Sequence, residues 1–433
     1  MKRNRKIKLE KWQIISVVCI LVCLILALIF ADFVTEKTNF YGKLASNQTT
    51  KNKVETSDYY VSYIDVGQGS STFAKLPDGK TLVIDGGNVE YGETVVNFLN
   101  KHSVSKIDYL IATHADSDHI GGLNDVLENF EVKNIFRPFQ IAVSKFSQLE
   151  VYADEDLKSV YDYLEQNENL MINKVSSDSY RTFITNIYSE EFSIGNETYY
   201  SSVNVFYDGL KITGKNYKIE FFAPLKADRS IDISNYCDRT GGFVTKIPKN
   251  DSNDCSAIFT LTCNNKDKFL FMGDARYTEK NPNSNDYSEY VFLESLTDDE
   301  LKELSKVDVL LVAHHGSGYS TSKELLETTL PEFVVISVGK NSYGHPTQSL
   351  LERLKNLKGT NKDFMLRTDT GGDIEFTNVG GKLMYCLSTE SKLRQLTISF
   401  RLVCIAMSTL VIIVIFSVKP KRNNPKDNFI DRN

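Results

Sequence analysis

Hydrophobic and polar positions divide the chain into a central body of short segments and two long apolar runs near its ends. β-type runs come first in the body, with a turn signal, Pro77-Asp78-Gly79, between two of them. The predicted strands are 59–66, 71–76, 81–84, 107–112, 218–222, 257–261, 269–272, 307–312 and 333–338, with two more near Met365 and Ile374; the predicted helices are 93–101, 123–130, 322–328 and 347–355. Strands followed by alternating strands and helices predict two sheets covered by helices, an α/β (α+β) body.

The first apolar run, residues 12–31, holds 20 positions without a charge. That is about the length of a helix that spans a bilayer. Six basic residues and one acid precede it, and basic flanks stay in the cytoplasm. We therefore predict a cytoplasmic tail, 1–11, and a transmembrane helix, 12–32. A cleaved signal peptide is the alternative, but residues 27–32 contain no small-x-small cleavage site.

The second apolar run, residues 402–418, has 17 uncharged positions and is followed by a basic tail, 419–433. It extends to 396–418 if Arg401 snorkels to the outer interface. A buried core helix is the alternative, but the basic tail and the lack of a later element to pack on it favour a second transmembrane helix. Both termini then lie in the cytoplasm of a membrane-anchored protein, and the body is extracytoplasmic.

Between the anchors we expect a polar stalk, 33–57, and one domain, 58–390. Residues from about 140 to 215 are rich in Tyr, Ser and Asn and are interpreted as an insertion or a lid. The whole chain carries a net charge of −6, the N-terminal block +5 and the tail +3, which leaves −14 for the part between them. An acidic body does not attract polyanions at long range, which weighs against a dedicated nucleic-acid grip.

One segment, residues 113–122, concentrates metal-ligating side chains. His114, Asp116, Asp118 and His119 occur within six residues, on a turn between a predicted strand and a predicted helix. Two carboxylates held this tightly would repel each other, and a bound divalent cation resolves that repulsion. A helix N-cap is the alternative, but capping requires one such residue and not four.

Further candidates follow other predicted strands. Asp274 ends one apolar strand, the pair His314 and His315 ends another, and the segment 337–347 contains Lys340 and His345. Any one of these alone would be a weak signal, since strand-end polar residues commonly start turns. Together they place a further acid and three more imidazoles at one edge of the strands. The seven cysteines include no Cys-x-x-Cys pair, so a thiolate metal site is disfavoured.

These segments resemble the metallo-β-lactamase superfamily, and within it the hydrolase domain of the ComEC competence proteins. The matching motifs are Asp-Val-Gly-Gln-Gly at 65–69, Asp-Gly-Gly at 85–87, His-x-Asp-x-Asp-His-x-Gly-Gly at 114–122, Asn-x-x-Ser at 253–256, Gly-Asp at 273–274, His-His-Gly-Ser at 314–317 and Ser-Val-Gly…Tyr-Gly-His-Pro at 337–346. The resemblance covers about 58–138 and 217–385. It implies a four-layer αββα sandwich, flanked here by the two transmembrane helices.

The chain departs from the pattern in three ways. Full-length ComEC is expected to carry a long multi-span channel domain, which this sequence lacks. Typical superfamily members have His where this chain has Asp116. They also have a ligand His before the Gly-Asp motif, whereas no His occurs here between His119 and His314.

The resemblance implies a site for two divalent metal ions, Mn²⁺ or Zn²⁺. His114 and Asp116 would hold one ion, Asp118 and His119 the other, and Asp274 would bridge them. We expect His314 as the last ligand of the second ion, with His315 as the alternative. The predicted catalytic residues are Asp118 and His345, the latter as a donor to a phosphate oxygen or to the leaving oxygen. The surrounding residues expected to support the site or bind substrate are Asp85, Asn253, Ser256, His315 and Lys340.

The sequence therefore predicts a membrane-anchored, extracytoplasmic, metal-dependent hydrolase. A binuclear phosphodiesterase or nuclease is favoured, with the lipid membrane as a partner through both helices and DNA or another phosphodiester as substrate. Hydrolysis of an amide, lactone or thioester in the envelope is an alternative, because the fold hosts many reactions. A non-catalytic metal-binding module is another, and β-lactamase activity is the least favoured enzymatic interpretation.

Overall fold

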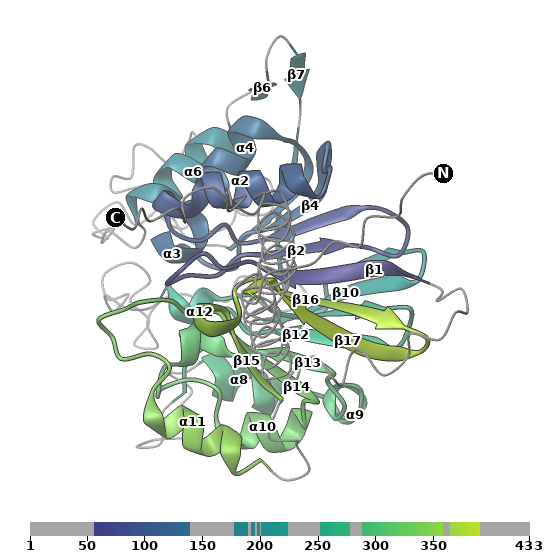
Figure 1. The fold of residues 1–433 in the computed structure, drawn as a ribbon, viewed down its shortest axis with the longest axis vertical. Coiled ribbons are helices and arrows are strands. Elements are labelled where there is room, and N and C mark those ends of the chain that lie inside the picture. The colour runs from purple at the N-terminus through teal and green to yellow at the C-terminus, as the bar shows by residue number, and fades with distance from the viewer. Residues whose placement is uncertain are drawn as a thin grey trace, which may run out of the picture. The chain divides into compact units, whose positions relative to one another are not determined.

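Two β-sheets lie face to face, and helices cover the outer side of each (Figure 1). The computed structural model describes residues 56–138, 177–188, 192–194, 197–199, 201–223, 252–277, 288–357 and 364–389. The α/β fold with two sheets, predicted from the sequence, is confirmed. The two predicted transmembrane helices lie outside these residues, and none of the helices inside them is long and apolar enough to cross a membrane.

The first sheet has eight strands, and its parallel half carries part of the site. Its order is β17 (Lys382–Leu387), β16 (Ile374–Val379), β1 (Thr56–Tyr63), β2 (Thr72–Lys75), β3 (Thr81–Ile84), β4 (Lys106–Ile111), β5 (Glu131–Arg137) and β8 (Ser202–Val205). Neighbours from β17 to β3 are antiparallel, and those from β3 to β8 are parallel. The turn signal at Pro77-Asp78-Gly79 lies between β2 and β3, as predicted.

The second sheet has seven strands, and its parallel half carries the rest of the site. Its order is β15 (Met365–Arg367), β14 (Phe333–Ile336), β13 (Val309–Leu311), β12 (Asp267–Phe271), β11 (Ile258–Cys263), β10 (Tyr217–Ala223) and β9 (Lys211–Gly214). The strands from β15 to β12 are parallel, so their carboxyl ends meet at one edge of the sheet. Ligands bind at such edges in α/β proteins.

Helices cover both outer faces. The first sheet is covered by α2 (Gly92–Lys101), α3 (Ser117–Ile120), α4 (Leu123–Asn129) and α6 (Asp178–Tyr188), and the second by α8 (Ser288–Ser295), α9 (Asp298–Leu304), α10 (Lys323–Thr329) and α11 (Gln348–Lys355) (Figure 1). The shorter elements are η1 (Val89–Tyr91), η4 (Asn253–Cys255), η5 (Ala313–Gly316), α12 (Thr368–Gly371) and the hairpin β6 (Phe192–Ile194) and β7 (Glu197–Tyr199).

The layers follow from the alternation of apolar side chains along the strands. In β13, Val309 and Leu311 point into the core between the sheets, and Leu310 points into the core under the outer helices. In β3, Leu82 and Ile84 face the inner core while Val83 packs under the helices. Strands apolar on both faces require cover on both sides, which explains the four layers.

Part of the predicted insertion, 140–215, belongs to these layers. Tyr180, Phe183 and Ile184 of α6 are buried in the core of the first sheet. β8 pairs with β5, and β9 pairs with β10, so both sheets gain an edge strand from this stretch. Residues 139–176 lie outside the described part of the chain.

Candidate metal centre

The candidate residues come from loops at the carboxyl ends of parallel strands. His114 follows β4, and Asp116, Asp118 and His119 lie on the turn into and within α3. Asp274 follows β12, and the pair His314 and His315 follows β13. Segments far apart in the sequence thus converge because the two parallel sheet halves end at one place.

Glycines let the loop of the first motif approach its neighbours. A Cβ on Gly122 would lie 2.1 Å from the carbonyl oxygen of Gly86, and a Cβ on Gly86 would lie 2.5 Å from the backbone nitrogen of Leu123. Across this contact the Gly86 N–H donates to the His119 carbonyl at 2.7 Å. The Asp-Gly-Gly and Gly-Gly motifs therefore lock together by backbone contact that larger residues would prevent.

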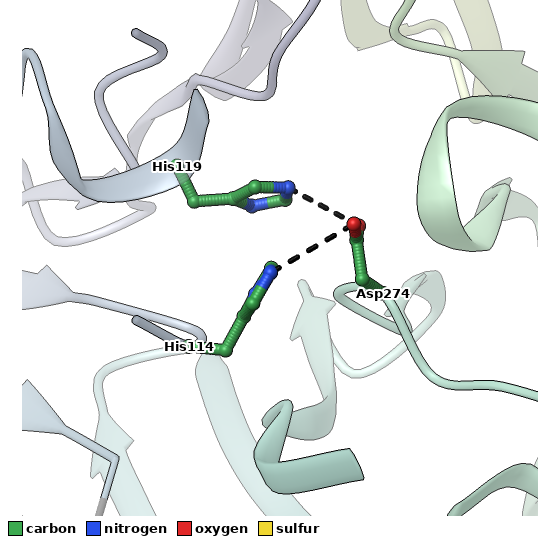
Figure 2. A group of neighbouring side chains, drawn as sticks. All are labelled: His114, His119 and Asp274. Atoms are coloured by element: carbon green, nitrogen blue, oxygen red, sulfur yellow. Dashed lines mark ion pairs between the residues drawn. The ribbon is translucent and has the colours of Figure 1, made fainter. Parts of the chain in front are cut away.

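Asp274 is the centre of the cluster, and its carboxylate is buried. His119 Nε2 lies 3.1 Å from Asp274 Oδ1, and His114 Nε2 lies 3.8 Å from Asp274 Oδ2. Figure 2 shows both imidazoles directed at this carboxylate from the opposite side of the site. His315 and His314 approach it as well, each with Nε2 at 3.7 Å from Oδ2. The buried Ser256 Oγ accepts from the Asp274 N–H at 2.9 Å and orients this loop.

A second group joins Asp118, His119 and His315. His315 Nε2 lies 3.3 Å from Asp118 Oδ2 and 3.2 Å from His119 Nε2. The other ring nitrogens are already committed: His119 Nδ1 donates to Asp85 Oδ2 at 2.7 Å, and His315 Nδ1 donates to the Ser337 carbonyl at 3.0 Å. In the neutral tautomers both Nε2 atoms then carry lone pairs that face each other. A cation between them removes that repulsion.

The tautomer of His114 is fixed in the same way, with Nε2 left as the lone pair. Its Nδ1 contacts the Thr113 hydroxyl at 3.1 Å, and that hydroxyl donates to Asp85 Oδ2 at 2.7 Å. The Thr113 oxygen therefore accepts from His114 Nδ1, which leaves Nε2 as the free lone pair. Among the described residues, the buried His114 Nε2 has no hydrogen-bond partner, and the buried Asp274 Oδ1 lies beside the His119 imidazole without a hydrogen bond. Buried polar atoms without partners are costly, so the donor set fits divalent metal.

Two groupings could hold a metal ion within the described residues: His114, His119 and Asp274, and Asp118, His119 and His315. A cavity of about 10 Å³ lies at the centre, lined in part by Asp85, His119, Asp274 and His315. Of the two adjacent histidines, His315 belongs to one of these groupings and His314 to neither. His314 is a quarter exposed and faces His345, with ring centroids 5.6 Å apart.

The carboxylates and imidazoles of the cluster shift each other's pKa values. Burial opposes the charged form of Asp274, but the surrounding imidazoles hold its pKa well below the usual range. Burial likewise opposes a charged His119, but Asp274 and Asp85 raise its pKa well above the usual value. Burial, together with His314 and His315, lowers the pKa of His345 to about 4, which makes this imidazole neutral near pH 7.

A pocket of about 630 Å³ opens beside the cluster. Its lining is polar and comes from several loops: Gln68, Asn88, Glu90, Tyr91, Asp116, Ser117, Asp118, Ser177, Ser252, Lys340, Asn341, Ser342 and Tyr343. Lys340, expected to support the site or bind substrate, lies on this wall and not at the metal-ligating centre. Asp116 connects the two regions, since it lies 3.8 Å from His114 Nε2 and accepts from Ser252 Oγ at 2.5 Å.

Sequence reasoning missed three supporting residues. Thr113, Ser252 and Ser337 orient His114, Asp116 and His315, respectively. Each lies within or directly beside a motif that was recognised, which is the signal that could have found them. Asn253, predicted beside the site, is buried, and its Oδ1 has no hydrogen-bond partner among the residues that the structure describes.

Comparisons with known proteins find similarity to one protein superfamily and to several individual proteins. Residues 64–154 match the model of the metallo-beta-lactamase superfamily. Over 342 residues the chain is 24% identical to ComE operon protein 3 of Bacillus subtilis, an alignment covering 74% of this chain and 33% of that protein. It is 23% identical to Recombination protein 2 of Haemophilus influenzae over 306 residues, covering 69% and 27%. The metallo-beta-lactamase fold protein YhfI of Bacillus subtilis aligns with a TM-score of 0.37 and 10% identity, covering 73% of this chain and 99% of that one.

Residues 64–154 are thus similar to the metallo-β-lactamase superfamily, the resemblance that the sequence motifs predicted. Over most of its length the chain is similar to ComE operon protein 3 and to Recombination protein 2. It spans about a third of the length of the curated relatives that it matches.

The substitution Asp85→Asn tests whether the Asp85 carboxylate fixes the tautomer and orientation of His119. The amide side chain would be nearly isosteric, but its NH₂ would face His119 Nδ1–H and the Thr113 hydroxyl, which both donate to Asp85. The imidazole must then change tautomer and present Nε2–H to the metal. We expect metal affinity, measured by competition with a chelating dye, to fall about 10- to 100-fold. Asp369→Asn, at an exposed pair with Arg367, is the control, and equal affinities for both variants would contradict this role.

Proposed function

We propose that this chain is a binuclear, metal-dependent phosphodiesterase. The observation that carries the proposal is the pair His119 and His315. Their Nε2 atoms face each other at 3.2 Å while both Nδ1 atoms donate to fixed acceptors. Beside the carboxylates of Asp118 and Asp274, these two Nε2 atoms are oriented to coordinate a cation.

The ligand sets follow from the two groupings. His114, Asp116 and Asp274 would hold one ion, and Asp118, His119 and His315 the other, with Asp274 between them. The assignment of His315 in place of the expected His314 rests on burial and on the Ser337 carbonyl that orients its ring. Three carboxylates against three imidazoles form a hard donor set, which suits Mn²⁺ or Zn²⁺.

The chemistry divides between the ions and the protein. Bound divalent ions would stabilise charge on a phosphoryl group and lower the pKa of a water molecule. Asp118, a predicted catalytic residue, contacts the imidazole of His315 and so helps to orient that ring. His345 is neutral near pH 7, so it donates a hydrogen bond through its N–H and not a proton as an imidazolium. Lys340, on the wall of the pocket, would orient a phosphate, and His345 lies behind that wall beside Tyr343, with ring centroids 5.7 Å apart.

A phosphodiester is the favoured substrate for two reasons. The hard donor set fits phosphoryl transfer, and one relative, Recombination protein 2, is named for recombination, a process that acts on DNA. Amide, lactone or thioester hydrolysis in the envelope is the second candidate, because the polar pocket does not contain a group unique to phosphate.

The function is tested with the full chain, purified without chelator in mild detergent. We expect two divalent ions per chain and Mn²⁺-stimulated cleavage of bis(p-nitrophenyl) phosphate and of linear DNA. The Asp118→Ala/His119→Ala variant should lose at least about 100-fold in kcat/KM, because it removes ligands of the ion pair. Two bound ions without phosphodiester cleavage would redirect the search to amide, lactone and thioester substrates. A wild-type chain without metal would contradict the mechanism.

Single variants separate the adjacent histidines. His315→Ala should reduce the metal content from two ions to one, because it removes a buried ligand. His314→Ala should retain both ions, because His314 lies outside the two groupings. The measurement is metal stoichiometry by mass spectrometry after exhaustive dialysis. The reverse pattern would restore His314 as the ligand.

We also propose that residues 12–32 and 396–418 anchor the protein, with both tails cytoplasmic and the catalytic domain outside. The support is the apolar length of the two runs and their basic flanks. The full chain should stay in the membrane fraction at alkaline pH, and external protease should digest the body while the terminal tails stay protected. A variant lacking residues 1–32 and 396–433 is the control and should be released. Release of the full chain would contradict the anchors.

A further inference from the structure

The loop after β14 presents a cation and an aromatic ring beside the candidate metal centre. Lys340 and Tyr343 line the same pocket as Asp116 and Asp118. Tyr343 is 73% exposed, an unusual position for a large ring, and its hydroxyl makes no hydrogen bond with the described part of the chain. Lys340 is exposed and forms no ion pair with the described residues. Both side chains are therefore available to a ligand.

The loop is held rigidly in spite of its exposure. Asn341 Nδ2 donates to the carbonyls of Gly339 at 2.9 Å and His345 at 2.8 Å. Asn341 Oδ1 accepts from the N–H groups of Tyr343 and His345, each at 3.0 Å. At the base of the loop, a Cβ on Gly339 would lie 2.3 Å from the carbonyl carbon of Gly67, so the two backbones are in direct contact. The backbone that carries Tyr343 is thus fixed, and its ring lies beside that of His345, with ring centroids 5.7 Å apart. A fixed loop lowers the entropic cost of binding on it.

The chemistry of the two side chains is complementary. Tyrosine rings stack on nucleobases without regard to sequence, and lysine is a point charge for phosphate. The other charged side chains on the wall of the pocket are the carboxylates of Glu90, Asp116 and Asp118, so Lys340 is the one cation of this lining, among the described residues, that can contact a phosphate. The pocket, at about 630 Å³, has the size of a small-molecule site and not of a groove along a duplex.

We propose that Tyr343 and Lys340 form a subsite for one nucleotide unit next to the scissile phosphate. The base stacks on the exposed ring of Tyr343, and the phosphate lies toward Lys340 and the metal centre. This inference rests on the proposed phosphodiesterase function and adds that the enzyme binds an unpaired nucleotide whose base is turned away from its neighbours. The reaction adds water to phosphorus and breaks one P–O ester bond, with no other reactant.

The test compares two substrates that differ only in the base. They are the p-nitrophenyl esters of thymidine 5′-phosphate and of the abasic deoxyribose 5′-phosphate, assayed with the full chain and Mn²⁺. The wild type should prefer the thymidine ester in kcat/KM by roughly 5- to 100-fold, the range for stacking one base. Tyr343→Ala should abolish this preference, and Tyr343→Phe should keep it. Lys340→Ala should lower kcat/KM for both esters by a similar factor and leave the preference.

Tyr319→Ala is the matched control. Tyr319 is 64% exposed but does not line the pocket, so this variant should keep the wild-type preference. A preference that survives in Tyr343→Ala, or that is equally lost in Tyr319→Ala, would overturn the subsite.

A binding measurement separates failure of the subsite from failure of the proposed function. Stacking quenches the fluorescence of 2-aminopurine, so 2-aminopurine deoxyriboside 5′-monophosphate should be quenched by the wild type and by Tyr343→Phe but not by Tyr343→Ala. Quenching without cleavage of either ester would support the subsite and contradict the phosphodiesterase. Cleavage without Tyr343-dependent quenching would support the phosphodiesterase and contradict the subsite.

Discussion

The burial of one carboxylate, Asp274, determines the arrangement of the whole site. A buried charge is tolerated only when it is paired or bound to metal. Around Asp274 the chain gathers imidazoles from both sheets, with His114 and His119 from the first and the adjacent His314 and His315 from the second. Protons on the imidazoles compensate the charge in the protein alone, as the raised pKa of His119 shows. Divalent ions would perform the same compensation with greater charge and defined geometry.

The loops that deliver these side chains hold strained backbone. Asp85, His314 and His315 have φ values of 56°, 53° and 51°, in the left-handed region that disfavours side chains. Such conformations persist where the surroundings determine them strongly. Behind the histidine pair, the buried carboxylate of Glu289 accepts from the N–H groups of Thr321 and Ser322 at 2.7 Å each, and Arg353 donates to carbonyls of the same loop. Ser320 and Thr321 of that loop also hydrogen-bond to the backbone of Ala313, so contacts to α8 and α11 support the backbone that leads into the histidine pair.

The sequence predicts most of the strands, the helices α2, α4, α10 and α11 and the converging loops because their signals are local: alternation, turn residues and motif spacing. It does not predict strand β5 or the helices α6, α8 and α9. It does not distinguish His314 from His315, since both follow β13 directly and only the backbone torsion decides which ring turns inward. It also interprets 140–215 as an insertion, although β8 and β9 extend the two sheets. β8 and β9 are short edge strands of mixed polarity, whose pairing depends on tertiary contacts and not on a pattern of their own.

The acidic character of the chain is compatible with an anionic substrate, because the net charge of the body and the charges at the site act at different distances. At physiological salt, exposed charges are screened beyond about 8 Å, so the net charge of the body affects the approach of a long polyanion more than the site itself. At the site, bound divalent cations would be the largest local charges and would reverse the sign set by Asp116 and Asp118. The reacting phosphate would then be bound through the metal ions and one lysine. These contacts would involve one phosphate of the substrate, which agrees with the proposed subsite for a single unpaired nucleotide of a longer polymer.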